Sequence, residues 1–425
     1  MTDPRWTTTA AALLALILGP AGLRGQPAPD GTPTGWYRDG DGRRVLVSPA
    51  PDSGYRYLDF EGADFGSVAL VPAGEADSGT GVRALLDGSG AVREIRSSAG
   101  VAWRRMEDAP YTVAELAFAG DGGVPLAGLL LRPDRPRLGA VMIHGSGDSD
   151  RDNAWAYTFA HALADAGVCV LFPDKRGSGG SGGDWRRVGL DALARDAVAA
   201  AEELADRCGL ADEAIGWVGL SQGGWVAPVA HRFAGGGAFQ VAVSAAAVPV
   251  FDQMAHETLN ALRAAGAGGE TLDRARELLM AVRDRATGRS SWSAYVERRD
   301  SLGRGPLADL VSALPGEPDH WRWAWWSRVG RIDPLASWAQ SEVPVLVVYG
   351  QADETDNVPV ARSVRRLEAL GRAPGSPSVD VSVFPELGHT LVDDDTGWID
   401  RVALDRIVRW VLARADDTAL RPPER

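Results

Sequence analysis

Residues 214–227 read Ala214-Ile-Gly-Trp-Val-Gly-Leu-Ser-Gln-Gly-Gly-Trp-Val-Ala227. The first seven of them are apolar or glycine and predict a strand that is buried on both faces. The motif Gly219-Leu-Ser221-Gln-Gly223 comes next, and a helix is predicted from Gly223 onward. Glycines on both sides of Ser221 allow the sharp strand–turn–helix bend that projects a serine hydroxyl from the edge of a sheet. This context favours a nucleophilic serine over an incidental serine in a glycine-rich turn.

Strands and helices alternate on both sides of this bend, over residues 111–415. Continuous apolar runs predict strands at Leu126–Leu131, Leu138–Ile143, Val168–Phe172, Ile215–Leu220, Phe239–Ser244, Val343–Tyr349 and Val379–Phe384. Helices are predicted between and after them, at Trp155–Asp165, Leu190–Arg207, Val358–Leu370 and Trp398–Ala413. Such alternation predicts an α/β fold with a mostly parallel sheet and helices on both of its faces.

A serine hydroxyl needs a base to remove its proton. In this architecture the partners of the serine follow it in the order acid, then histidine. Among the histidines after Ser221, His231 lies on the predicted helix of the bend, and His256 and His320 lie in a later helical segment. Only His389 follows the last predicted strand. We therefore predict His389 as the general base.

The acid should follow the strand Val343–Tyr349. The loop there reads Gly350-Gln-Ala-Asp-Glu-Thr-Asp356 and holds three carboxylates. Asp353 is nearest the position at which such loops turn back, and it would fix the tautomer of the imidazole and stabilise its cation. Asp356 is the second choice.

The negative charge that develops on a reacting carbonyl oxygen needs backbone N–H donors fixed in advance. One predicted donor is the amide of Gln222, directly after the nucleophile. The other is the amide of Ser146 in the loop after the strand Leu138–Ile143, with Gly147 as an alternative. His144 is predicted to shape this loop.

A second glycine-rich stretch, Asp174-Lys-Arg-Gly-Ser-Gly-Gly-Ser181, invites comparison with phosphate-binding loops. It lacks the Gly-Lys-Ser/Thr ending of that motif, and no helix start follows it. We interpret it as the tight loop after a strand, so nucleotide binding is not predicted.

The remaining segments differ in composition from the α/β part. An N-terminal basic residue, a short apolar stretch and a Gly-Pro break predict a secretory signal over residues 1–25, and hence a secreted or periplasmic protein. Residues 26–34 are predicted to be a linker, 35–110 a small β-rich module and 416–425 a C-terminal tail. Residues 251–340 are predicted to be a helical cap inserted over the carboxyl ends of the strands, where ligands bind in open α/β sheets. Most of the six tryptophans in this cap are expected to form its core.

The formal net charge of −13 and the absence of a run of basic residues argue against nucleic-acid binding and against an anionic membrane surface. No integral membrane span is expected in the mature chain, because the apolar stretch near the N-terminus is too short. The two cysteines, Cys169 and Cys208, lack metal-ligand spacing, and the sequence leaves open whether they form a disulfide.

Taken together, these motifs resemble the α/β-hydrolase superfamily over roughly residues 115–415. The loop Gly145-Ser-Gly-Asp-Ser-Asp-Arg-Asp152 and the segment Gly223-Gly-Trp-Val-Ala-Pro228 are similar to those of exported bacterial esterases and of serine-aminopeptidase-like or dienelactone-hydrolase-like members. The resemblance implies hydrolysis of carboxylic esters without a metal or an organic cofactor.

The predicted function is therefore that of a serine hydrolase that cleaves small-molecule esters through an acyl-enzyme intermediate. A peptidase, an amidase or an acyltransferase is the alternative, because the same triad serves all of them. A non-catalytic binding protein on the same fold is a weaker alternative, since such proteins normally lose a triad residue. The sequence predicts neither the natural substrate nor the oligomeric state.

Overall fold

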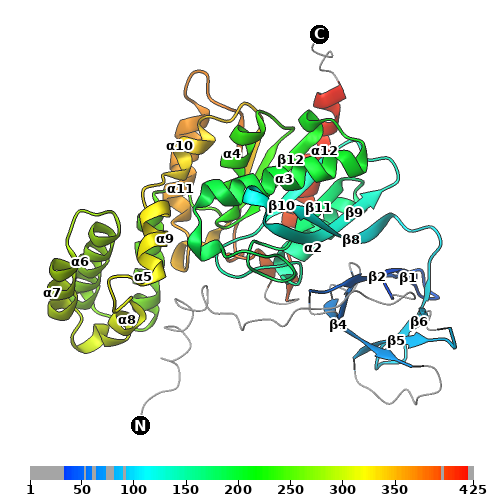
Figure 1. Cartoon of the computed structure of the whole chain (residues 1–425), viewed down its shortest axis with the longest axis horizontal. Coiled ribbons are helices and arrows are strands. Elements are labelled where there is room, and N and C mark those ends of the chain that lie inside the picture. Colours follow the sequence, from blue (N-terminus) through cyan, green and yellow to red (C-terminus); the bar gives the residue numbers. More distant parts are fainter. Residues whose placement is uncertain are drawn as a thin grey trace.

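The computed structural model of the chain describes residues 33–51, 54–59, 64–72, 81–89, 92–393 and 397–419. The predicted signal, most of the predicted linker and the last six residues of the predicted tail lie outside these ranges. Figure 1 shows a small β-barrel and a group of inserted helices at opposite ends of the molecule, with a large sheet between them.

The large sheet has eight strands in the order β15-β14-β13-β12-β10-β11-β9-β8. Their bounds are β8 Tyr111–Ala119, β9 Pro125–Pro133, β10 Gly139–Ile143, β11 Cys169–Pro173, β12 Ile215–Leu220, β13 Gln240–Val243, β14 Val345–Gly350 and β15 Val379–Phe384. The six strands from β10 to β15 pair in parallel, whereas β9 and β8 add an antiparallel edge. All residues of β10, β12, β13 and β14 are buried, and all of them are apolar or glycine except Gln240 at the start of β13.

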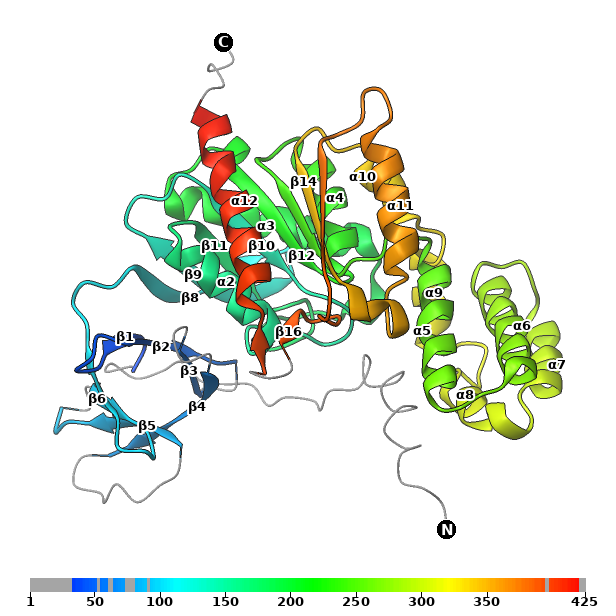
Figure 2. The same ribbon diagram turned by 180° about the vertical axis from the view of Figure 1, so that it is seen from behind.

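Helices cover both faces of this sheet, and the predicted fold class is confirmed. Helices α2 (Ala154–Asp165) and α12 (Arg401–Ala419) share one core with the sheet. Helices α3 (Leu190–Cys208), α4 (Gly223–Ala234) and α11 (Val360–Gly371) share the core on the other face. Figure 2 shows α2 and α12 in front of the sheet, on the side opposite to α3.

The helical insertion lies between β13 and β14. It contains α5 Val250–Ala264, α6 Gly269–Ala286, α7 Trp292–Leu302, α8 Ala308–Ala313, α9 Trp321–Val329 and α10 Pro334–Trp338. Trp323 and Trp326 belong to a core of the insertion together with Tyr295, whereas Trp338 belongs to the main core. Most of the tryptophans are thus part of the packing, as expected.

The N-terminal strands form a closed barrel of their own. They are β1 Gly35–Arg38, β2 Arg44–Pro49, β3 Tyr55–Asp59, β4 Asp64–Val71, β5 Val82–Leu86, β6 Val92–Arg96 and β7 Ala102–Arg105. The barrel packs on the large domain, since Trp36, Leu46 and Leu58 are buried in the same core as Tyr157 of α2. The hydroxyls of Ser48 and Tyr157 also form a buried hydrogen bond across this interface.

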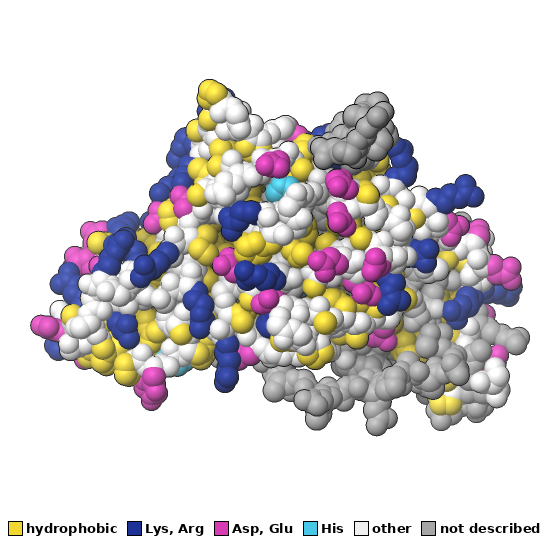
Figure 3. Space-filling model, turned by 45° about the horizontal axis from the view of Figure 1, so that its top comes forward, with side chains coloured by type: hydrophobic (Ala, Val, Ile, Leu, Met, Phe, Trp, Pro, Cys, Tyr) yellow, Lys and Arg dark blue, Asp and Glu magenta, His cyan; other side chains and the backbone are white. Residues whose placement is uncertain are grey.

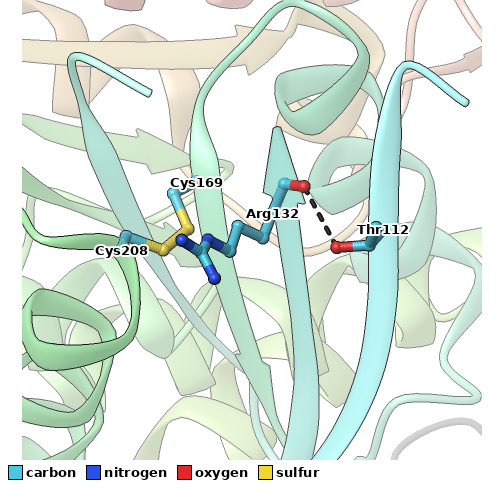
Figure 4. Close-up of a disulfide and its surroundings, with 4 residues drawn as sticks. All are labelled: Thr112, Arg132, Cys169 and Cys208. Carbon is cyan, nitrogen blue, oxygen red and sulfur yellow. Dashed lines mark hydrogen bonds between the residues drawn. A yellow bond between two sulfur atoms is a disulfide. The ribbon is translucent and has the colours of Figure 1, made fainter. Parts of the chain in front are cut away.

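A disulfide joins Cys169, the first residue of β11, to Cys208, the last residue of α3. Figure 4 shows it beside the strands at the antiparallel edge of the sheet, where the hydroxyl of Thr112 donates a hydrogen bond to the carbonyl of Arg132. The bond ties a strand to a helix that covers it, across a sequence separation of 39 residues.

On the surface in Figure 3, basic and acidic side chains are interspersed with apolar ones. Among the helices that the structure describes, none is both long enough and apolar enough to cross a bilayer.

Candidate active site

Ser221 lies in the bend between β12 and α4, with a φ of 50°. This left-handed conformation is strained for a residue other than glycine, and such residues cluster at functional sites. The neighbouring glycines leave no room for a side chain, because a Cβ on Gly223 would lie 2.1 Å from the carbonyl oxygen of Ile143. A Cβ on Gly219 would lie 2.3 Å from the backbone of Gly223. The sequence therefore builds a narrow turn that only small residues can enter.

Asp353 and His389 are in direct contact, although 36 residues separate them. Nδ1 of His389 lies 2.7 Å from Oδ2 of Asp353, whose side chain is fully buried. Oδ1 of the same carboxylate accepts hydrogen bonds from the amides of Asn357, at 3.1 Å, and Val358, at 3.3 Å. Asp356 is exposed. The carboxylate that orients the imidazole is thus that of Asp353.

The pKa of His389 is raised above its ordinary value. Burial, the largest single effect, lowers it, but the hydrogen bond and the charge of Asp353, together with the charges of Asp356 and Glu257, outweigh this effect. The contact with Asp353 occupies Nδ1 and leaves Nε2 to interact with a substrate or a nucleophile.

The loop of His389 is attached to the strand ends near Ser221. The hydroxyl of Ser244, directly after β13, donates to the backbone carbonyl of His389 at 2.6 Å. The amide of Ser221 donates to the carbonyl of Val243 at 2.8 Å. In the described part of the chain, no hydrogen bond joins Oγ of Ser221 to the imidazole of His389. Such bonds are often long in unliganded enzymes and shorten when substrate binds.

The loop after β10 is shaped by His144, as predicted. Nε2 of His144 donates to the carbonyl of Pro173 at 2.7 Å, and Nδ1 accepts from the hydroxyl of Ser149 at 2.8 Å. Burial lowers the pKa of His144 to about 4, so the ring stays neutral and keeps these two roles at neutral pH. The loop passes close to the nucleophile, because a Cβ on Gly145 would lie 3.4 Å from Cβ of Ser221.

A pocket of about 150 Å³ opens next to Ser221. Gln222, Ser146 and Gly147, which are the predicted oxyanion residues, line it together with Ser221. The rest of its wall comes mainly from the helical insertion and is mostly apolar; it includes Trp185, Trp225, Val250, Met254, Leu279, Val282, Leu310, Leu314, Trp321, Trp325 and Trp326.

One acidic residue of this pocket was not predicted. Glu257 of α5 lines the pocket, and its charge acts on His389. Burial raises the pKa of Glu257 to about 7, with the charges of Asp356 and Asp353 acting in the same direction against that of His389. No pattern in the sequence marks it, because the face that an inserted helix turns toward a distant loop depends on tertiary packing.

The chain matches the family model described as "Alpha/beta hydrolase family" over residues 140–402. No curated protein matches it. Similar solved structures include an esterase of Pyrococcus furiosus, with 18% identity, 72% of this chain and 91% of that chain covered and a TM-score of 0.43. They also include a proline iminopeptidase of Mycobacterium smegmatis, with 16% identity, 72% and 100% covered and a TM-score of 0.44. A third is Est1E of Butyrivibrio proteoclasticus, bound to ferulic acid, with 17% identity, 72% and 100% covered and a TM-score of 0.45.

Proposed function

Because the chain belongs to the α/β-hydrolase family, we propose that it is a serine hydrolase that cleaves carboxylic esters through an acyl-enzyme intermediate. The observation that carries this proposal is the hydrogen bond between the buried Asp353 and His389, at the same strand ends from which Ser221 projects in a left-handed conformation. An acid that orients a histidine, beside a serine on a strained turn, is the arrangement that activates a hydroxyl for attack.

In the first half of the reaction, Oγ of Ser221 attacks the carbonyl carbon of the ester while Nε2 of His389 takes the hydroxyl proton. The carbonyl oxygen becomes negative and is held by the amides of Gln222 and Ser146. The tetrahedral intermediate then collapses. The bond to the alcohol oxygen breaks, His389 returns its proton to that oxygen, and the acyl group remains on Ser221.

In the second half, a water molecule attacks the acyl carbon and gives one proton to His389. The bond to Oγ of Ser221 breaks, the serine recovers this proton, and the carboxylic acid leaves. Asp353 keeps the imidazole in the required tautomer and stabilises its cation at both stages.

The apolar wall of the pocket supports a substrate with an apolar acyl or alcohol group. Burial of each CH₂ group contributes about 0.8 kcal/mol, so rates should rise with chain length until the pocket is filled. A series of p-nitrophenyl esters from acetate to decanoate would measure that limit.

The central test is the variant Ser221→Ala. A fluorophosphonate probe should label the wild type and not this variant, and hydrolysis of p-nitrophenyl butyrate should fall by about 10⁵- to 10⁶-fold. The matched control is Ser312→Ala, an exposed serine of α8, which should label and hydrolyse normally. Retained labelling and turnover in Ser221→Ala would remove Ser221 from the mechanism.

A second candidate function is favoured by Glu257. A carboxylate in an apolar pocket beside His389 would bind the ammonium group of an aminoacyl ester or amide. The comparison of alanine p-nitroanilide with p-nitrophenyl propionate separates the two functions. Faster cleavage of the anilide, abolished in Glu257→Gln, would identify an aminopeptidase; cleavage of the propionate alone would identify an esterase.

We also propose that the mature protein is secreted or periplasmic. The Cys169–Cys208 disulfide supports this location, since disulfides persist mainly in oxidising compartments. Fractionation of expressing cells, with N-terminal sequencing of the exported form, would test both export and removal of residues 1–25.

A further inference from the structure

Lys175 is the only lysine in the chain, and all other basic residues apart from histidine are arginine. It is the second residue after β11, and the residue is 8% exposed. No ion pair in the described ranges includes it, so its charge is buried without a carboxylate in contact. A buried ammonium is costly unless all of its donors are used.

The three donors of this ammonium all have acceptors. Nζ of Lys175 lies 2.7 Å from the carbonyl oxygen of Gly145, 3.0 Å from that of Gly147 and 3.2 Å from Oε1 of Gln222. Nζ also lies 4.9 Å from the centre of the ring of Trp185, which is a favourable position for a cation. The acceptors come from the two segments that supply the proposed oxyanion donors.

We propose that protonated Lys175 is a positioning residue that fixes the direction of the oxyanion donors. The carbonyl of Gly145 belongs to the same planar peptide group as the N–H of Ser146, and in a trans peptide the two point in opposite directions. Holding the carbonyl therefore aims the N–H. The bond to Gln222 ties this loop to the start of α4. This inference rests on the proposed function.

The role requires the protonated form. An ammonium has three N–H donors, whereas a neutral amine has two and would turn its lone pair toward one of the three oxygens. Arginine would not fit the same acceptors, because its donors lie in a plane. Loss of the proton would therefore release part of the loop, and the proposed hydrolysis should slow as pH rises.

The surroundings of Lys175 determine the pH at which it loses its proton. Burial lowers the pKa of Lys175 to about 7, with Asp148 raising it and Arg186 lowering it. Of the neighbouring titratable groups, His144 stays neutral, and Asp174, which precedes Lys175 in the chain, is paired with Arg151. The pH profile of the proposed hydrolysis should thus be narrow, because His389 sets its acid limb and Lys175 sets an alkaline limb close to it.

The direct measurement is NMR of protein labelled with ¹³C at lysine Cε, which gives a single lysine signal. Its titration yields the pKa of Lys175, and the alkaline limb of kcat should have the same midpoint. A lysine titration whose midpoint differs from that of the alkaline limb would overturn the proposal. An alkaline limb that Glu257→Gln removes, while the lysine signal is unchanged, would also overturn it.

The variant Lys175→Met separates positioning from folding. We expect kcat to fall by about 100-fold, the lower end of the loss for one oxyanion donor, with KM little changed and no alkaline limb. Fluorophosphonate labelling of Ser221 should persist at a reduced rate. A kcat within about threefold of wild type, in a variant whose circular dichroism is normal, would sink the idea; no labelling of the wild type would instead sink the proposed function.

Two charge variants test the same idea without touching the lysine. Asp148→Asn should move both the lysine titration and the alkaline limb to lower pH, and Arg186→Gln should move both to higher pH. These variants also cover the case in which Lys175→Met does not fold. Movement of the lysine signal without movement of the limb would contradict the proposal.

Discussion

At the scale of single residues, the site is controlled by buried groups whose charge depends on their neighbours. His144 is buried and stays neutral, whereas His389 is stabilised as a cation by Asp353. Both histidines lie in loops at the carboxyl ends of the parallel strands. Their charge states differ because His144 contacts a carbonyl and a hydroxyl, whereas His389 contacts a carboxylate. Contacts of this kind decide which side chain can carry a proton.

The choice between two acids gives the first prediction. Asp353→Asn should reduce kcat by about 10³- to 10⁴-fold, because the amide would favour the wrong imidazole tautomer. Asp356→Asn, in the same loop, should remain near the wild-type rate, because Asp356 is exposed. Steady-state kinetics on one ester compare them, and equal losses in both variants would contradict the assignment.

The second prediction concerns Glu257 and pH. The base must be neutral to act, so kcat/KM should rise with pH through the raised pKa of His389. Glu257→Gln removes a negative charge that favours the imidazolium, and the acid limb should therefore move to lower pH, by up to about one unit. Glu270→Gln, an exposed change on α6, is the control and should leave the limb in place. An acid limb that stays in place in Glu257→Gln would show that the charge of Glu257 does not reach His389.

At the scale of elements, the sheet was predictable because its parallel strands are buried on both faces and thus leave unbroken apolar runs. The bounds predicted for Ile215–Leu220 and Val379–Phe384 match β12 and β15. The strand β8 was not predicted, because its partly exposed sequence alternates irregularly. The last helix begins at Arg401, since Trp398 and Ile399 pair with β16 (Val392–Asp393) before it starts.

The disulfide between β11 and α3 gives a prediction at this scale. Removing it in Cys208→Ala should lower the free energy of unfolding by about 2–4 kcal/mol, the usual effect of opening a loop of this size. Urea unfolding with and without reductant measures it, and activity at 25 °C should be kept because neither cysteine lines the pocket. If the urea midpoint of the wild type is the same with and without reductant, and two free thiols can be titrated, the disulfide is absent.

At the scale of the whole molecule, the sequence predicted an α/β domain, a β-rich module and a helical cap, but not the contacts between them. The order of Ser221, Asp353 and His389 along the chain could be predicted because the topology of the strands dictates it. The barrel closure, its packing on α2 and the position of Glu257 depend on contacts between segments far apart, and no local pattern encodes these. The same holds for Lys175, which the sequence shows only as part of a glycine-rich loop.

The shared core between barrel and large domain gives the last prediction. Leu46→Ala removes a fully buried side chain of that core and should lower the free energy of unfolding of the whole chain by about 2–5 kcal/mol, in one transition. Val101→Ala, at an exposed position before β7, is the control and should change it by less than about 0.5 kcal/mol. Two separate transitions in calorimetry, only one of them shifted, would mean that the barrel folds independently.

The solitary buried lysine also makes the chain an unusual substrate for proteases. An endoproteinase that cuts only after lysine has one site, and in the native state this site is inaccessible. Digestion should therefore follow global unfolding and produce two fragments, one that ends at Lys175 and one that begins at Arg176. Because Cys169 and Cys208 lie on opposite sides of the cut, the fragments should stay together on a gel without thiol and separate when thiol is added.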